Sequence, residues 1–349
     1  PPQAENRTEQ AKEAMREQLT VAQAGEARTI AAIRTAAPSS LNGDDAAVLE
    51  VTAPNSRHVC STDILVQGRH FDFRYSLPRE VGIKAVTQSF ADIQAMGARP
   101  TAVLLAIATP GDLPLKTVAD IAGGIHEAAS PWAAELVGGD VVKSKDLVIS
   151  LTALGELAGP APALTLDGAG VGHQVIASGH IGYSAAGLAI LQHFGSRRAV
   201  PQDDPILQEL VEWHCAPHLP VARGSVARAA GAASMTDNSD GLIRDLGLIA
   251  DRSAVCIDIE SAAIAPDEKL QHAAECVGGD AWKWVLTGGE DHTLLGTTDT
   301  RVPSGFKAIG RVRSLTSQVA VDVFGEHTDE SAVLVDGTRP QFTAGWQSL

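Results

Sequence analysis

The sequence predicts an α/β protein of mixed α+β character with two domains. Its 349 residues exceed one ordinary domain and suit two. Strand-length apolar runs alternate with helix-length amphipathic segments, as where the run 101–108 is followed by the helical pattern of 115–129. Residues 155–172 are rich in Gly, Pro and Ala and separate two mixed halves of the chain. A hydrophobic content of 44% is enough to form sizeable cores.

The first half is expected to hold an N-terminal extension and one domain. Residues 1–25 are rich in Glu, Gln, Arg and Ala, so we expect them to be helical and to precede the fold. The first domain is predicted over residues 26–158. Helical spacing of apolar residues and continuous apolar runs predict its elements in this order: helix 26–36, strands 48–51 and 58–61, helix 79–96, strand 101–108, helix 115–129, and strands 135–137 and 147–154.

The second domain is predicted over residues 159–349, again with strands and helices mixed. The same patterns predict strand 174–178, helices 185–194, 206–214, 221–230 and 242–251, and strands 255–259 and 293–297.

Composition and charge exclude several classes of function. The formal net charge of −15 disfavours nucleic-acid binding, which depends on phosphate neutralisation. No apolar run approaches the roughly 20 residues of a membrane helix, and the N-terminus has no apolar centre of a signal peptide. The four cysteines are scattered without a Cys-x-x-Cys pair, which argues against a framework held by zinc or by disulfide bonds. This cysteine usage suits a reducing, cytoplasmic location.

Common catalytic and nucleotide-binding motifs are absent. There is no Walker loop, and the glycines of 168–172 do not have the spacing of the Rossmann fingerprint. Ser184 is not in a nucleophile elbow, because the second glycine is displaced, and a structural role is favoured. His214 and His218 have i, i+4 spacing, but Pro217 breaks the helix that this spacing would need, which favours a loop.

Acidic residues next to glycine or small polar residues recur along the whole chain. Any one of these pairs alone is most simply a turn or a helix cap. Together they indicate a site for Mg²⁺ and polyphosphate, because clustered carboxylates repel one another until a hard divalent cation neutralises them. Glycine beside them lets the backbone approach a ligand closely. The six segments are 43–45, 61–63, 91–92, 138–140, 237–241 and 288–291.

Read in order, seven motifs resemble those of the thiamine-monophosphate kinase family. The resemblance extends over roughly residues 28–346, with the family's order and spacing. The segment 61–71 and the Gly-Gly-Glu-Asp motif favour this family over related synthetases. The motifs are 43–47 (GDDAA), 61–71 (STDILVQGRHF), 91–100 (ADIQAMGARP), 138–140 (GGD), 179–188 (GHIGYSAAGL), 237–242 (DNSDGL) and 288–292 (GGEDH).

The resemblance implies a fold and an activity. The fold is that of aminoimidazole ribonucleotide synthetase, with an N-terminal ATP-binding domain and a C-terminal α/β domain, usually paired as a homodimer through N-terminal strands. The activity is Mg²⁺-dependent transfer of the γ-phosphoryl group of ATP to thiamine monophosphate, giving thiamine diphosphate. The attacking phosphate oxygen is already ionised at neutral pH, so we nominate no catalytic base. Catalysis then rests on positioning and on charge neutralisation by several metal ions.

The resemblance also implies roles for individual residues. Asp44 is left open between helix capping and metal ligation. Gly139, Asp140, Lys143 and Ser239 match nucleotide-binding positions, and His70, Asp291 and Trp346 match substrate-binding positions. For Trp346, a C-terminal core anchor is an equal alternative. The residues expected to ligate Mg²⁺ are Asp45, Ser61, Thr62, Asp63, Asp92, Asp140, Asp237 and Asp240.

Three departures from the family pattern bear on these expectations. The family commonly has Asn ahead of Ser-Asp where this chain has residues 88–92 (QSFAD), and Lys143 stands where Arg is frequent, which keeps the charge but loses bidentate recognition. Leu166 occupies the position of an Arg that contacts ATP in the family. Two other hypotheses therefore stay open: a different ATP-dependent enzyme of the superfamily, and a non-catalytic protein that binds nucleotide or thiamine phosphate.

Overall fold

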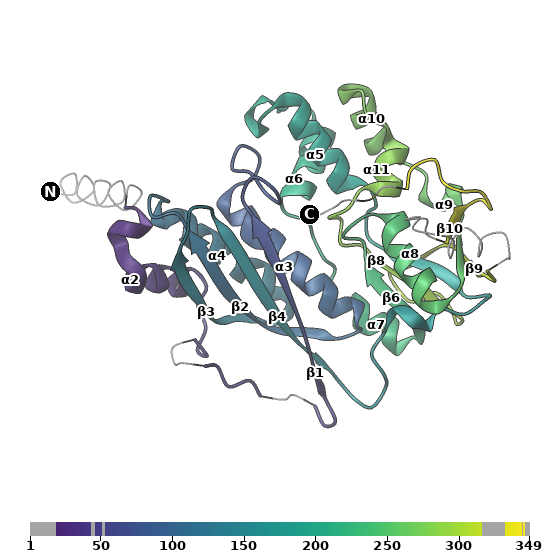
Figure 1. Ribbon diagram of the computed structural model, residues 1–349, viewed down its shortest axis with the longest axis horizontal. Helices are drawn as coiled ribbons and strands as arrows, with labels where there is room; N and C mark the ends of the chain where they lie inside the picture. The colour runs from purple at the N-terminus through teal and green to yellow at the C-terminus, as the bar shows by residue number, and fades with distance from the viewer. Residues whose placement is uncertain (1–18, 43–45, 51–52, 316–331, 344, 346–349) are drawn as a thin grey trace. The chain divides into compact units, whose positions relative to one another are not determined.

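The chain is a mixed α/β protein with two sheets, as predicted. The computed structural model describes residues 19–42, 46–50, 53–315, 332–343 and 345 (Figure 1). It divides into two compact units. The first unit comprises Pro1–Glu50, Cys60–Ser89 and Thr101–Leu154, and the second comprises Val51–Val59, Phe90–Pro100 and Gly155–Leu349. The contiguous domains at 26–158 and 159–349 stay a prediction, since these units interleave along the chain.

The first sheet has four strands in the order β1-β4-β2-β3. Strands β2 and β3 are parallel, and helix α4 makes the crossover between them. Helix α2 begins at the capping box of Thr20 and Gln23, five residues before the predicted start. The elements are α2 (Val21–Ala36), β1 (Arg57–Val66), α3 (Pro78–Ala95), β2 (Arg99–Thr109), α4 (Leu115–Ala129), η1 (Ser130–Trp132), β3 (Glu135–Lys143) and β4 (Val148–Leu157).

Two predicted strand ends in the first sheet are wrong. Strand β1 continues through Thr62 and Asp63 to Val66, and β3 continues through the Gly-Gly-Asp motif to Lys143. Pairing explains the second case, because β2 and β3 pair from Ala102 opposite Glu135 to Thr109 opposite Lys143, with one register shift between Val103 and Leu104. This pairing overrides the low strand propensity of Gly and Asp in the Gly-Gly-Asp motif of β3. Residues 48–50 were predicted as a strand, but they are not in one.

Helices α3 and α4 cover one face of the first sheet and lie behind it in the view of Figure 1. Their backbones approach so closely at two glycines that a side chain would not fit. A Cβ atom on Gly82 would lie 2.1 Å from the carbonyl oxygen of Ile121, and one on Gly124 would lie 1.9 Å from that of Arg79. These glycines therefore set the distance between the two helices.

The second sheet has six strands in the order β10-β7-β9-β5-β8-β6. Its strands pair antiparallel except for β10 with β7. Helix α8 packs on this sheet, and α5, α6 and α10 pack together. The elements are η2 (Leu166–Gly168), β5 (Gln174–Ser178), α5 (Tyr183–Phe194), η3 (Arg197–Ala199), α6 (Pro205–Cys215), α7 (Arg223–Ala229), β6 (Ala232–Asp237), α8 (Leu242–Ser253), β7 (Cys256–Ile259), α9 (Ser261–Ile264), α10 (Glu268–Val277), α11 (Ala281–Thr287), β8 (Leu294–Thr298), β9 (Lys307–Arg313) and β10 (Val333–Val335).

Arg228 and Arg57 both donate hydrogen bonds to backbone carbonyl oxygens of the Gly-, Pro- and Ala-rich segment within the second unit. The Arg228 guanidinium on α7 donates hydrogen bonds to the carbonyl oxygens of Pro162 at 2.7 Å and Ala158 at 3.0 Å, and also to that of Ala161. Burial lowers the pKa of Arg228, and the positive charge of Arg57 adds to this effect. The segment is thus held by backbone contacts that its own composition does not reveal.

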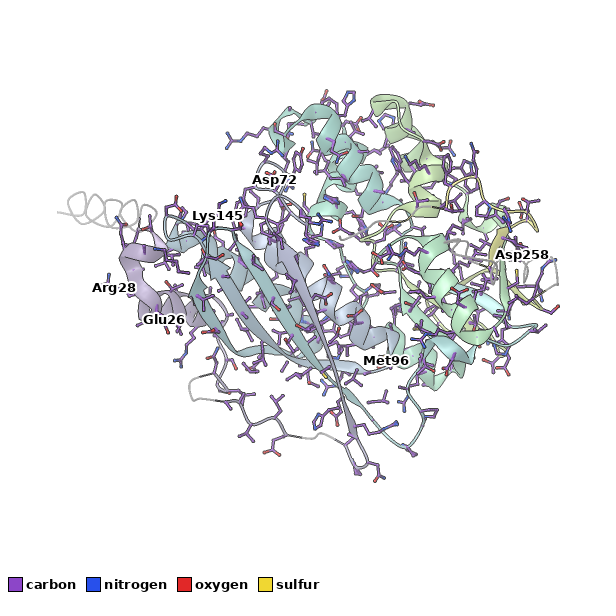
Figure 2. The ribbon with its side chains drawn as sticks, viewed as in Figure 1. Glu26, Arg28, Asp72, Met96, Lys145 and Asp258 are labelled. Carbon is purple, nitrogen blue, oxygen red and sulfur yellow. The ribbon has the colours of Figure 1, made fainter. Side chains whose placement is uncertain are left out.

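Some buried acids have a purely structural partner. Asp258 on β7, labelled in Figure 2, pairs with Arg313 on β9 at 2.6 Å and accepts the N–H of Gly337 at 2.8 Å.

No helix among the described residues has the length and apolar character needed to cross a membrane.

We predict opposite effects for alanine at two adjacent glycines of α4. Gly124→Ala should lower the free energy of unfolding by about 1–3 kcal/mol, because the new methyl group meets the backbone of Arg79. Gly123→Ala should raise it by about 0.5–1 kcal/mol, because open space surrounds that position and alanine favours the helix. Urea unfolding followed by circular dichroism measures both. Equal effects of the two substitutions would contradict the close contact between α3 and α4.

Candidate functional site

Asp63 of the first unit is held by two residues of α3. Gln88 donates its amide to Oδ1 of Asp63 at 2.9 Å, and Ser89 donates its hydroxyl to Oδ2 at 2.8 Å. Ser89 is fully buried, whereas Asp63 on β1 is half-buried. Both carboxylate oxygens are therefore oriented, and each keeps a further lone pair for a cation. Gln88 belongs to the segment 88–92, where the family commonly has Asn ahead of Ser-Asp. Its amide side chain, one methylene longer than that of Asn, reaches the aspartate.

His70 lies in the turn that follows β1, and its ring orientation is defined. Its Nδ1 accepts the backbone N–H of Val66 at 3.1 Å, so the neutral ring carries its proton on Nε2. The buried Lys84 on α3 donates from Nζ to the His70 carbonyl oxygen at 3.2 Å. Val66 and Lys84 thus hold this turn in place.

The predicted residues of β1 and β3 lie on the two edge strands of the first sheet. Thr62 contacts Thr152 of β4 through their hydroxyl groups at 3.0 Å, and Ser61 precedes it on β1. On β3, Asp140 and Lys143 are exposed, and the N–H of Val141 donates to Asp140 at 2.9 Å.

Gly139 is required where β3 passes β2. Its φ is +158°, and a Cβ atom there would lie 1.8 Å from the carbonyl oxygen of Leu105. Only glycine fits this approach. Asp92 is half-buried on α3. Gly43, Asp44, Asp45 and Trp346 lie outside the described residues, so their predicted roles stay predictions.

In the second unit, the two acidic motifs of residues 237–241 and 288–293 lie side by side. Three backbone hydrogen bonds join them: Asn238 N–H to Thr293 O at 2.8 Å, Glu290 N–H to Ser239 O at 2.8 Å, and His292 N–H to Asn238 O at 3.0 Å. A Cβ atom on Gly289 would lie 2.1 Å from the Ser239 carbonyl oxygen. The sequence separates these motifs by about fifty residues, and the sheet brings them together.

The carboxylates of this motif pair are buried close to one another. Asp237 contacts Nδ1 of the buried His292 at 3.0 Å. Burial raises the pKa of Asp240; Arg244 opposes this rise, and the negative charges of Asp237 and Glu290 add to it. Asp245 accepts the N–H groups of Asp240 at 3.0 Å and Gly241 at 2.9 Å. Burial, with repulsion from Asp237 and Asp240, raises the pKa of Asp245 to about 8.

Asp291 lies at the N-terminus of α5 and is almost fully buried. One of its oxygens accepts the N–H of Gly182 at 2.5 Å and the other accepts that of Ser184 at 2.7 Å. A carboxylate at a helix N-terminus is favoured by the unpaired N–H groups and the helix dipole. The neighbours Glu290 and His292 both have positive φ, at 62° and 53°, which is uncommon for residues other than glycine. The motif is therefore strained around Asp291.

Ser184 and His214 are in contact, but not as a catalytic pair. The Ser184 hydroxyl lies 3.0 Å from His214 Nδ1, and Glu290 lies 3.8 Å from the same nitrogen. In a catalytic triad the acid and the nucleophile engage opposite ring nitrogens. Helix α6 ends at Cys215, before Pro217, so His218 lies in a loop as predicted.

The donor atoms of the second unit fit Mg²⁺. Asp237, Asp240 and Glu290 offer hard carboxylate oxygens, and a divalent cation would favour the ionised form of Asp240, which burial and its acidic neighbours disfavour. Asn238 is fully buried, and neither its amide nitrogen nor its amide oxygen has a hydrogen-bond partner among the described residues. A buried polar group in this state points to a ligand or to bound water.

Comparisons with known proteins identify the family of this chain. A protein-family model described as AIR synthase related protein, N-terminal domain, matches residues 43–157. A thiamine-monophosphate kinase from Corynebacterium glutamicum is 51% identical over 337 residues, covering 97% of each chain. The chain belongs to the thiamine-monophosphate kinase family. A family member from Mycobacterium tuberculosis is 40% identical and covers 88% of this chain and 85% of its own.

Solved structures of the family have the same fold. A thiamine-monophosphate kinase from Stenotrophomonas maltophilia is 28% identical with a TM-score of 0.73, covering 90% of this chain and 96% of that one. A structure of AaThiL complexed with AMPPCP and TMP is 29% identical with a TM-score of 0.70, covering 93% of this chain and 97% of that one. A hydrogenase maturation protein at 19% identity and a TM-score of 0.61 shares the fold alone.

Four residues near the predicted site were assigned no role from the sequence. Gln88 and Lys84 are polar positions of a helix that looks simply amphipathic, and nothing local links them to β1. Asp245 lies four residues after Gly241 in the first turn of α8, where the sequence pattern of an acid indicates only interaction with the helix N-terminus. His292 directly follows the Gly-Gly-Glu-Asp motif, and a histidine beside an acidic motif was a usable signal.

We predict that Asp291 makes stability depend on pH. Burial raises its folded pKa from 3.8 to about 7, against the lowering by the Ser184 and Gly182 N–H groups. The native state therefore binds more protons than the unfolded state between about pH 4 and 7, so stability should fall as pH rises through this window. The slope is on the order of 1.4 kcal/mol per pH unit at most.

Urea unfolding of the wild type and of Asp291→Asn at several pH values tests this. The variant has a constant penalty, because an amide nitrogen now faces a backbone N–H, but it lacks the titration. The stability difference between wild type and variant should shrink as pH rises from 4 to 7. A difference that is independent of pH would contradict the raised pKa.

Proposed function

We propose that this protein transfers the γ-phosphoryl group of ATP to thiamine monophosphate, giving thiamine diphosphate and ADP. The observation that carries the proposal is 51% identity to a thiamine-monophosphate kinase over 97% of the chain. The complex of AaThiL with AMPPCP, an analogue of ATP, and TMP supports the same two ligands here. The paired acidic motifs of the second unit and the oriented Asp63 of the first suit polyphosphate chemistry.

The acidic residues are proposed to hold Mg²⁺ ions. Ligands in the described residues would be Ser61, Thr62, Asp63, Asp92, Asp140, Asp237 and Asp240, and Asp45 is proposed from the family resemblance. Bound Mg²⁺ would neutralise the charge that develops on the transferred phosphoryl group. Ligand oxygens would be oriented before Mg²⁺ binds, as those of Asp63 are by hydrogen bonds from Gln88 and Ser89.

The remaining roles concern the two substrates. Gly139, Lys143 and Ser239 are proposed to contact the nucleotide, and Lys143 supplies a cation. His70 would donate from Nε2 to the phosphate of thiamine monophosphate, since its Nδ1 is occupied by Val66 N–H. Asp291 is proposed to lie at the thiamine end, as is Trp346. No general base is needed, because the phosphate oxygen is already anionic.

Leu166 is the departure that bears most on ATP binding. It lies in η2, where the Ser253 hydroxyl donates to its carbonyl oxygen at 2.8 Å. Its side chain supplies no charge, so the other nucleotide contacts must provide the affinity.

We further propose a cytoplasmic homodimer. The four cysteines form no disulfide bond, which suits a reducing compartment. One face of the first sheet stays partly exposed, including Ile64, with 54% of its surface accessible, and Ala106. A second copy of this chain would cover these apolar positions.

Light scattering should give a mass twice the 36.3 kDa of one chain. The substitution Ala106→Arg should lower the measured mass to that of one chain.

The deciding experiment is product analysis with purified protein, thiamine monophosphate, ATP and Mg²⁺. We expect thiamine diphosphate and ADP in equal amounts, and no product when EDTA removes the metal. If ATP binds but no thiamine diphosphate forms, the kinase proposal fails and a binding protein is favoured. ADP formation with a different acceptor would favour another enzyme of the superfamily.

Substitution of two proposed ligands should reduce turnover while leaving the fold intact. We expect Asp63→Asn and Asp240→Asn to lower kcat by roughly a hundredfold or more, because each removes a charge that would ligate metal. Asparagine can keep both contacts of Asp63, since the Ser89 hydroxyl accepts as well as donates.

Two aspartates on helices serve as controls. Asp120→Asn on α4 and Asp251→Asn on α8 change the same group outside the proposed ligands and should keep near-normal kcat. Near-normal activity of Asp63→Asn or Asp240→Asn at saturating Mg²⁺ would refute their assignment as ligands.

A further inference from the structure

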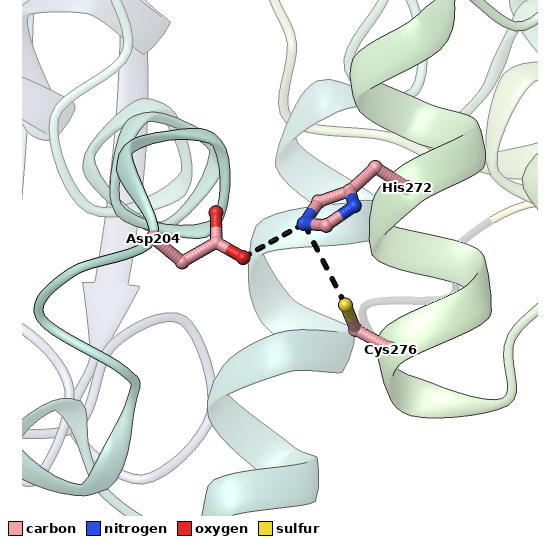
Figure 3. Close-up of side chains that lie close together, drawn as sticks. All are labelled: Asp204, His272 and Cys276. Carbon is pink, nitrogen blue, oxygen red and sulfur yellow. Dashed lines mark hydrogen bonds and ion pairs between the residues drawn. The ribbon is translucent and has the colours of Figure 1, made fainter.

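A second cluster of metal-ligand side chains lies in the second unit, among residues that the proposed kinase reaction does not use. Asp204, His272 and Cys276 each offer one donor atom, and these atoms lie within 4.8 Å of one another, with Asp204 and Cys276 both facing the same ring nitrogen of His272 (Figure 3). Asp204 is the N-cap of α6, and the other two residues lie on α10. The i, i+4 spacing of His272 and Cys276 places both on one face of that helix.

The distances suit a small tetrahedral ion. His272 Nε2 lies 3.6 Å from Cys276 Sγ. Two such ligands around zinc, at about 2.0 and 2.3 Å from the ion, lie roughly 3.5 Å apart. Asp204 Oδ2 is 2.7 Å from the same nitrogen, a hydrogen-bond distance that a small rotation of either side chain would widen. Binding would replace the shared proton by the metal.

The cluster is held in place by its surroundings. Asp204 Oδ1 caps α6 by accepting the N–H groups of Ile206 at 3.0 Å and Leu207 at 3.1 Å, which leaves Oδ2 directed at His272. One turn before, Lys269 of α10 forms an ion pair with Glu209 of α6 at 2.5 Å. The two helices are therefore already joined, so little has to be ordered when an ion binds.

A nucleophilic role for Cys276 is disfavoured by the same contacts. Both the carboxylate and the thiol address Nε2 of His272, whereas a catalytic Cys-His-Asp set uses both ring nitrogens. A bound divalent cation would stabilise the Cys276 thiolate.

We propose that Asp204, His272 and Cys276 form a site for a zinc-class divalent transition metal that links α6 to α10. Oxygen, nitrogen and sulfur donors together select Zn²⁺ or Co²⁺ over Mg²⁺, which requires oxygen ligands. Three protein ligands leave a fourth position for water. The side chains of Asp204 and His272 are 22% and 37% exposed, so an ion can enter from solvent.

Cobalt titration tests the site directly. Reduced, chelator-treated full-length protein is titrated with Co²⁺, and a near-ultraviolet thiolate-to-cobalt charge-transfer band is followed. We expect a saturable band with one Co²⁺ per chain, which Zn²⁺ removes and excess Mg²⁺ does not. Zn²⁺ should also raise Tm, and the rise should grow with the logarithm of the Zn²⁺ concentration above the dissociation constant. Absence of a saturable band in the wild type overturns the proposal.

Variants assign the ligands. Cys276→Ser should abolish the band, and Asp204→Asn should weaken Co²⁺ binding by about tenfold or more while preserving the α6 cap, since asparagine caps as well as aspartate. Cys60→Ser, which removes an exposed cysteine on β1, is the matched control and should leave the band unchanged. A band of wild-type intensity in Cys276→Ser, or its loss in Cys60→Ser, refutes the assignment.

Discussion

Backbone N–H groups hold buried carboxylates in the second unit, and the arrangement of its helices depends on this interaction. Asp245 takes the N–H groups of Asp240 and Gly241 where α8 begins, and Asp291 takes those of Gly182 and Ser184 where α5 begins. A buried carboxylate has lost its hydration and needs hydrogen-bond donors, and a helix N-terminus has N–H groups that lack acceptors. The same hydrogen bonds satisfy both groups. These bonds hold the N-terminal ends of α5 and α8 against the acidic motifs.

Close backbone contact is the second condition for this arrangement. The motif pair of residues 237–241 and 288–293 requires Gly289 against the Ser239 carbonyl oxygen and Gly241, with φ of +125°, against that of Thr287. A methyl group at either position would separate the strands of backbone that carry Asp237 and Asp291. The glycines beside the acids thus act on the protein's own backbone, whatever ligand they also approach.

The first unit orients its acid in a different way. Asp63 lies on a strand, and its two oxygens are held by the side chains of Gln88 and Ser89 rather than by a helix end. Side-chain donors leave Asp63 half-buried and accessible to a cation. In the second unit, burial raises the pKa values of Asp240 and Asp245, so both are costly to ionise. A cation bound at the proposed ligand Asp240 would offset this cost.

Much of the secondary structure could be predicted from local patterns. Helix 115–129 and strand 174–178 have the predicted bounds, and α3 and α8 agree within two residues. Strands β6, β9 and β10 were missed, because short segments without a strong period look like loops. The ends of β1 and β3 were misplaced, because Asp and Gly stop strands by propensity, whereas the ladder between β2 and β3 continues.

The sequence by itself determined the α/β class, the family and the acidic residues, since these depend on local period and on motif order. Only the tertiary structure decided which acids meet and what holds them. Gln88 reaches Asp63 from another element, His292 contacts Asp237 across fifty-five positions, and Asp204 faces His272 and Cys276 from a different helix. Such pairs are joined by sheet pairing and helix packing, and no local pattern in the chain records contacts between residues so far apart.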